Sequence, residues 1–170
     1  MVRDSAYLES IDGRRDWSYH NFRDTEIETY EGAVNSLIEK GYWVFRMGKV
    51  VREKFSVNHP RFVDYANSSD RCDFLDIWLV ANCYFCISNG TGLDELARIF
   101  RRPAVYVNSL PLQEMVTYDH VMSVPKHLVW EGKNKQLTLS EHLAYPYYRT
   151  DQYDNEKILV VDLTPKDIKQ

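Results

Sequence analysis

Short apolar strand patterns alternate with amphipathic helix patterns along most of this chain, and this alternation limits the fold more than any other feature. One helix pattern starts at Thr25, with Glu28 placed as in a capping box, and ends before Gly41. The run Tyr42–Arg46 directly after it is apolar and β-prone, as in strands buried on both faces of a parallel sheet. A helix, a glycine and a buried strand form half of a βαβ unit.

The alternation continues to about residue 108, with predicted strands at 62–65, 84–88 and 104–108 and a helix at 93–100. A further helix is predicted at 73–81, with an inward face of Phe74, Ile77, Trp78 and Ala81. We expect a doubly wound, mostly parallel α/β sheet of the Rossmann type, in one domain over residues 1–170.

Residues 112–170 carry a weaker pattern. It predicts strands at 121–124, 128–130 and 158–161, a loop at 145–148, and a last helix that Thr164 caps and Pro165 begins. Only Met1 and Val2 precede Arg3 as strand material, and the last helix is cut short at Gln170. We therefore expect both ends to be trimmed from a longer unit.

Composition and charge narrow the functional classes. The 21 Lys and Arg against 25 Asp and Glu give a formal charge of −4 at pH 7. No overall positive field therefore attracts nucleic acid or an anionic membrane, and a polyanion site must be local. No apolar run reaches the roughly 18 residues of a membrane helix, and the first residues lack a signal-peptide pattern. We expect a soluble cytoplasmic protein.

Cys83 and Cys86 have the CxxC spacing of redox and zinc sites, but the run around them is apolar and aromatic. Residues three apart in a strand face opposite sides, and no second CxxC or histidine pair lies at zinc-finger spacing. The pattern favours reduced core thiols over redox or zinc chemistry.

Ligands of doubly wound sheets bind at the carboxyl ends of the strands. The turn Ser88-Asn89-Gly90-Thr91-Gly92 follows one predicted strand and opens a helix. Its glycines let the backbone approach a ligand, and a helix N-terminus suits phosphate, although the same glycines also suit a tight corner without a ligand. Asp94 and Glu95 suit the helix dipole, and a carboxylate there could also bind ribose hydroxyls.

Arginines and a histidine elsewhere in the chain extend this candidate site. Arg46 ends an apolar strand, so it pairs either with an internal carboxylate or with a ligand phosphate, and Arg3 has the same two interpretations. In the loop 17–24, Arg23 could neutralise phosphate. His20 could act as an acid or base, or be a packing or surface residue.

Ordered motifs between Arg3 and Pro111 resemble those of a family of bacterial glycosyltransferases with the GT-B fold. These motifs are residues 3–7, 17–24, 46–48, 64–66, 73–76 and 88–93. The chain is similar to the C-terminal, donor-binding half of these enzymes. The loop at 90–93 also resembles the donor loop of heptosyltransferases, with Gly90 in place of the acid and Leu93 in place of the proline. Arg3 resembles the His-x-Arg arginine that meets the donor diphosphate in fucosyltransferase-like enzymes.

The resemblance implies the donor-binding half of a glycosyltransferase that acts in bacterial surface glycan assembly. The donor-binding residues would be Arg3, Arg46, Ser88, Asn89, Gly90, Thr91 and Gly92, with His20, Arg23, Asp94 and Glu95 near the cleft and the catalytic residue open. No metal or other cofactor is implied. The implied partners are a nucleotide-sugar, an acceptor, and an N-terminal acceptor domain or partner chain. The alternative is a non-catalytic nucleotide- or glycan-binding module that needs a partner chain.

Overall fold

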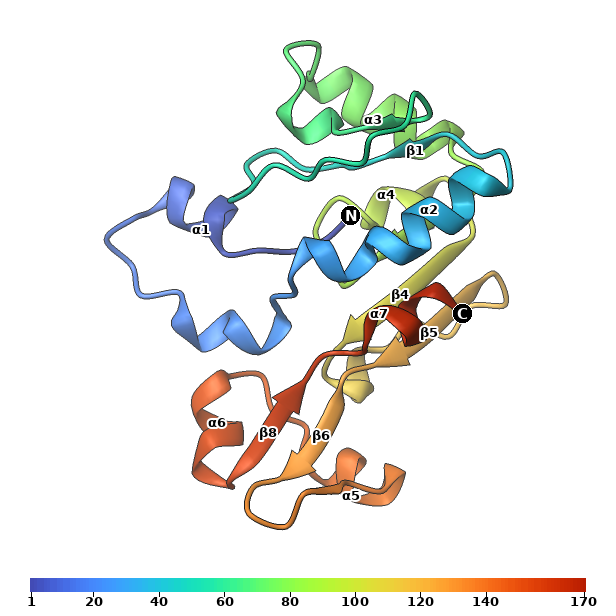
Figure 1. Cartoon of the computed structure of the whole chain (residues 1–170). Coiled ribbons are helices and arrows are strands. Elements are labelled where there is room, and N and C mark those ends of the chain that lie inside the picture. Colours follow the sequence, from blue (N-terminus) through green and yellow to red (C-terminus); the bar gives the residue numbers. More distant parts are fainter.

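The computed structural model describes residues 1–170 and contains helices around three small sheets (Figure 1). Strands β3 (Cys86–Ser88), β4 (Ala104–Ser109) and β5 (Val121–Pro125) form a parallel sheet in that order. A second parallel pair is β1 (Val44–Phe45) with β2 (Phe62–Val63). The third sheet is antiparallel, with β6 (His127–Trp130) between β7 (Lys135–Gln136) and β8 (Ile158–Val161). The mixed α/β class is confirmed, whereas the parallel strands fall into two sheets and not one.

The helices connect and cover these strands. They are α1 (Ala6–Ile11), α2 (Glu31–Glu39), α3 (Asp73–Asn82), α4 (Glu95–Ile99), α5 (Leu139–Ala144), α6 (Thr150–Asn155) and α7 (Pro165–Lys169). Short 3-10 turns lie at η1 (Ser18–Arg23), η2 (Ile27–Tyr30), η3 (Tyr65–Asn67) and η4 (Leu112–Glu114). No helix is long and apolar enough to cross a membrane.

Two apolar clusters cover opposite faces of the parallel strands. On one face, Ala33 of α2 and Ile168 of α7 pack around Val107 of β4, and Ile87 contacts this cluster. On the other face, α3 and α4 contribute to a cluster that Cys86 contacts. Because Cys86 and Ile87 are neighbours in β3, the clusters lie on opposite sides of the sheet.

The predicted inward face of α3 is wrong. Phe74 is 71% exposed, Ile77 and Trp78 are also exposed, and the buried residues are Asp76 and Val80. The helix is apolar on two sides, and the sequence does not show which side meets the sheet. Arg71 donates a 2.7 Å hydrogen bond to Asp76, so this buried carboxylate is paired.

Several element boundaries also differ from the prediction. The helix expected from Thr25 begins as the turn η2 and becomes α-helical only at Glu31, without a side-chain cap. The helix expected at 93–100 is the five-residue α4. At the C-terminal end the prediction is confirmed, because Thr164 and Asp167 form a capping box at the start of α7.

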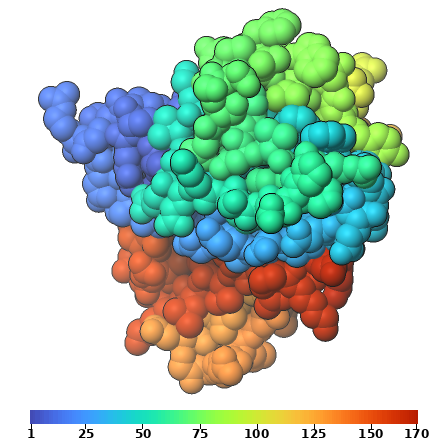
Figure 2. Space-filling view, turned by 45° about the horizontal axis from the view of Figure 1, so that its top comes forward, coloured from blue at the N-terminus to red at the C-terminus, as the bar shows by residue number.

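The segment from β6 to β8 forms a lobe at the lower end of the molecule, coloured orange to red (Figure 2). Its core contains Leu128, Tyr153 and Ile158, which pack with Phe22 of η1. Only Lys126 separates β5 from β6. Its ammonium donates a 2.6 Å hydrogen bond to the Asp24 carbonyl and lies 2.7 Å from the Asp162 carboxylate. The start of this lobe is thereby attached to the end of η1.

Candidate functional site

The loop Ser88–Gly92 leaves the carboxyl end of β3 and is held from inside by Asp94. The Asp94 side chain is buried, and its Oδ2 atom accepts hydrogen bonds from the Ser88 hydroxyl and, at 2.8 Å, from the Thr91 N–H. Burial raises the pKa of Asp94, and these hydrogen bonds oppose the shift. The Asp94 carboxylate is therefore part of the internal structure of the loop.

Gly90 allows a close contact between this loop and Arg23. Its φ angle is +89°, in the left-handed region that favours glycine. Its carbonyl accepts a 3.0 Å hydrogen bond from Nη2 of Arg23, and a Cβ at this position would lie 3.3 Å from the same nitrogen. Gly92 is exposed and has open space around it.

Asn89 joins the loop to two segments that lie far away in the sequence. Its side chain is only 2% exposed. Oδ1 accepts a 2.8 Å hydrogen bond from the Arg3 N–H, and Nδ2 donates a 3.1 Å hydrogen bond to the Arg23 carbonyl. The amide of Asn89 thus places both arginines at the end of β3.

The two arginines differ in their partners. The guanidinium of Arg3 lies 3.3 Å from the Asp24 carboxylate. Burial lowers the pKa of Arg3 and raises that of Asp24, while their mutual attraction opposes both shifts. The Arg23 guanidinium has no carboxylate within 4.0 Å and contacts the Gly90 carbonyl instead. Its Nε atom is buried without a hydrogen-bond partner.

His20 lies beside this arginine pair in η1. Its ring lies against that of Tyr19 in a tilted arrangement, with centroids 4.1 Å apart, and its Nδ1 atom is buried without a hydrogen-bond partner. Burial and the positive charges of Arg3 and Arg23 lower the pKa of His20. The imidazole is therefore neutral at pH 7 and able to accept a proton.

Arg46 has an internal partner. It is buried, its Nη1 atom donates a 2.6 Å hydrogen bond to the Glu53 carbonyl, and it lies 3.6 Å from the Asp64 carboxylate. Asp64 also accepts hydrogen bonds from Phe55 N–H and the Asn67 amide. Of the two interpretations of Arg46, the structure contains the internal ion pair.

A polar groove of about 550 Å³ is lined in part by Arg46 and Asp24. Its walls carry three arginines and six carboxylates, namely Arg15, Arg46, Arg52, Asp4, Glu9, Asp16, Asp24, Glu26 and Glu53. This excess of negative charge disfavours a polyphosphate in the groove. The region around Arg23 and Gly90 is the better candidate for an anion.

The structure thus brings together Arg3, His20, Arg23, Asn89 and Gly90. Ser88, Thr91 and Asp94 form the interior of the same loop, whereas Glu95 pairs with Arg98 on α4. Sequence reasoning missed Lys126. The signal that could have identified it is its position as a lone lysine inside an apolar, strand-forming run.

All three cysteines are free thiols. Burial raises the pKa of Cys83 and raises that of Cys86 to about 12, so these thiols are protonated at neutral pH. No group of three or more His, Cys, Asp or Glu side chains is arranged to hold a metal ion. No protein family, curated protein or solved structure matches this chain.

Proposed function

We propose that this domain binds a nucleoside-diphosphate sugar at the carboxyl end of β3, as the donor-binding half of a glycosyltransferase. The observation that carries this proposal is the environment of Arg23. Its guanidinium is partly buried, contacts the Gly90 carbonyl and has no carboxylate partner. A partly buried cation without an anionic partner is costly, and an anion in contact with it lowers that cost.

Backbone donors of the loop add to this cation. The N–H groups of Gly92 and Leu93 have no hydrogen-bond partner within the protein, and the Thr91 hydroxyl is buried without one. Phosphate oxygens accept hydrogen bonds from such groups. In the doubly wound arrangement that the sequence predicts, nucleotides bind at this edge of the sheet.

The same groups suit the chemistry of sugar transfer. When the bond between the sugar and the diphosphate breaks, negative charge develops on the leaving diphosphate. Arg23 and the N–H groups of Gly92 and Leu93 would stabilise that charge. Neutral His20 is the candidate proton acceptor on this chain. In this proposal the acceptor is a bacterial surface glycan precursor in the cytoplasm, bound by another domain or partner chain.

One observation favours a non-catalytic nucleotide- or glycan-binding module as a second candidate. Asp24, the carboxylate paired with Arg3, and Asp94, the carboxylate inside the loop, are both engaged within the protein. An enzyme half gains sugar-transfer activity when it is combined with its acceptor domain, whereas a binding module does not.

The test is isothermal calorimetry of the chain with UDP, GDP, dTDP, ADP and CMP. We expect one nucleoside diphosphate to bind best, and Arg23→Ala to weaken that binding at least tenfold, about the effect of losing one charge-assisted hydrogen bond. Arg98→Ala is the matched control, since Arg98 pairs with Glu95 away from the loop. No binding to the folded chain, or equal binding by Arg23→Ala, would overturn the proposal.

A further inference from the structure

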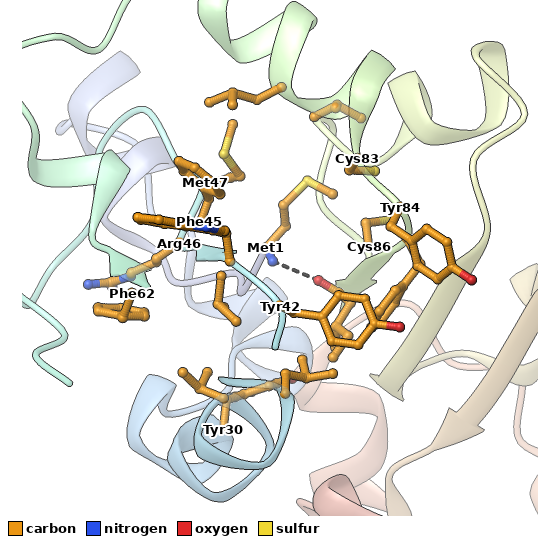
Figure 3. A pocket seen from close by; sticks show the side chains of 18 of the residues that line it. Met1, Tyr30, Tyr42, Phe45, Arg46, Met47, Phe62, Cys83, Tyr84 and Cys86 are labelled. Carbon is orange, nitrogen blue, oxygen red and sulfur yellow. Dashed lines mark hydrogen bonds between the residues drawn. The ribbon is translucent and has the colours of Figure 1, made fainter. Parts of the chain in front are cut away.

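An apolar groove of about 440 Å³ lies between the two parallel sheets (Figure 3). Residues Tyr42–Met47, around β1, line one side, and residues Cys83–Ile87, around β3, line the other. Tyr30 and Ala33 contribute from the α2 side, and Trp78 and Val80 from α3. The groove is therefore bordered by two strands and by helices that pack on opposite faces of the sheet.

Both strands beside the groove have an unpaired edge. Strand β1 pairs only with β2, and β3 pairs only with β4. Backbone N–H and C=O groups need hydrogen-bond partners when they are buried. A small apolar ligand offers no regular row of partners to two strand edges, whereas an extended peptide offers one on each side.

The segment Met1–Arg3 already runs along one of these strands. The Met1 amine donates a 2.7 Å hydrogen bond to the Ile87 carbonyl, drawn as the dashed line in Figure 3. Two residues on, the Arg3 N–H donates to the Asn89 side chain. In each of these hydrogen bonds the two residues are 86 positions apart in the sequence. The segment Met1–Arg3 therefore runs parallel to the chain from Ile87 to Asn89.

The Met1 amine occupies an unusual place for a charged group. Its surroundings are mostly apolar, and burial lowers its pKa. A peptide N–H at the same position would make the bond to Ile87 without carrying a charge. The hydrogen bond from Met1 is therefore the kind that the end of a parallel strand makes.

Large aromatic side chains around the groove lack cover. Trp43 is 60% exposed and Tyr84 is 76% exposed, and Trp78 is also exposed. All three line the groove. Clustered exposed aromatic residues mark a surface suited to contact with a further apolar group.

We propose that an apolar β-strand of about five residues, leading directly into Met1, fills this groove and pairs with β1 on one side and β3 on the other. Five residues match the stretches 42–46 and 83–87 that face each other across it. The strand order becomes β2, β1, the added strand, β3, β4, β5, all parallel. With the added strand as the first, this is the 3-2-1-4-5-6 order of doubly wound sheets.

This strand has a consequence for Arg3 and the loop after β3. In the completed sheet the chain order reverses between the added strand and β3. The carboxyl ends of these two strands then meet where Arg3 contacts Asn89. Doubly wound sheets bind their ligands in the crevice where the strand order reverses. The strand proposal does not depend on which ligand binds, and its test uses none.

Two extended forms of the chain test the proposal. One carries five alternating valines and isoleucines before Met1, and the other carries five alternating glycines and serines. We expect the apolar extension to raise Tm by about 3 °C or more, the effect of roughly 1 kcal/mol in a domain of this size, and the polar one to leave it unchanged. Equal Tm values for the two forms would overturn the proposal.

Thiol labelling provides a second measurement that works at low protein concentration. Cys83 and Cys86 line the groove, whereas Cys72 is exposed and lies outside its lining. We expect the apolar extension to slow labelling of Cys83 and Cys86 at least tenfold relative to the polar one, with Cys72 unchanged. Equal labelling rates in the two forms would show that the extension does not enter the groove.

The free apolar pentapeptide and an apolar fluorescent dye distinguish other occupants. A dye that binds the unextended chain and is displaced by the apolar extension supports the proposal. A dye that remains bound beside the extension identifies a small-molecule pocket and overturns it. Stabilisation by the free peptide without any effect of the extension indicates a strand from a partner, which also overturns it.

Discussion

Ser88 and Asp94, six residues apart, are joined inside the protein by a hydrogen bond from the serine hydroxyl to the carboxylate. Both side chains are almost fully buried. The Thr91 N–H donates to the same carboxylate oxygen, so the turn between them is fixed from within. Its shape is thereby set before any ligand arrives, and its outer side meets Arg23 at the Gly90 carbonyl.

The Asp94→Asn variant is expected to change how stability depends on pH. Burial raises the pKa of Asp94 above its ordinary 3.8, so the folded state binds this proton more readily than the unfolded chain does. The contribution of Asp94 to stability is therefore greatest at low pH and falls as pH rises from about 4 through the folded pKa. Urea unfolding across this range should show the free energy of unfolding of Asp94→Asn rising relative to that of the wild type. Above the folded pKa of Asp94, the difference between the two proteins should be constant. A pH-independent difference would contradict this.

Replacing Asn89 with alanine should destabilise the fold. The change leaves the Arg3 N–H and the Arg23 carbonyl without their partner. We expect the free energy of unfolding to fall by about 2–3 kcal/mol, measured by urea denaturation. The control is Asn82→Ala, which removes an exposed bond to the Trp78 carbonyl and should cost about 0.5 kcal/mol or less. Similar losses in both variants would argue against a connecting role for Asn89.

Gly90→Ala and Gly92→Ala form a matched pair. Alanine at 90 meets both an unfavourable positive φ and the nearby Arg23 nitrogen, so we expect a loss of about 1–2 kcal/mol. It should also weaken nucleotide binding, because Arg23 has to shift. At Gly92 a Cβ meets nothing within 4 Å, and the variant should lie within about 0.5 kcal/mol of the wild type. Thermal unfolding and calorimetry measure both effects.

The Arg46 and Asp64 side chains are expected to be coupled in stability. Arg46→Ala leaves Asp64 partly buried without its cation, at a cost of about 3 kcal/mol. Asp64→Ala leaves Arg46 buried without its anion, and the double variant should lose clearly less than the sum of the two. Additive losses would rule out the pair. A fall in nucleotide affinity at unchanged stability would instead place Arg46 in the donor site.

His20 should titrate below pH 6.5 in the folded protein. Burial and the charges of Arg3 and Arg23 disfavour its protonated form, so its contribution to stability is complete above about pH 6.5 and decreases as pH falls below it. Proton NMR of the imidazole measures the midpoint. A bound diphosphate should move this midpoint upward, because it offsets the nearby positive charges. An unchanged midpoint at saturating nucleotide would place the diphosphate away from His20.

Local sequence patterns were sufficient to predict β4, β8 and α7, because the residues that determine each element lie close together in the sequence. They also identified the turn after β3, since its glycines and its position are visible in the sequence. They could not choose the side of α3 that meets the sheet, because Phe74 and Val80 are both apolar. They also left the partner of Arg46 open, because Asp64 is one of many carboxylates in the sequence.

The contact between Arg3 and Asn89 also determines when this region can form during folding. The two residues are 86 positions apart, whereas β3, β4 and β5 are close neighbours along the chain. Loop closure over such a distance is slow compared with the pairing of nearby strands. On the ribosome, the arginine segments are synthesised long before the turn that they contact. They remain exposed until that turn has emerged, and during this interval they are open to chaperones and to proteolysis.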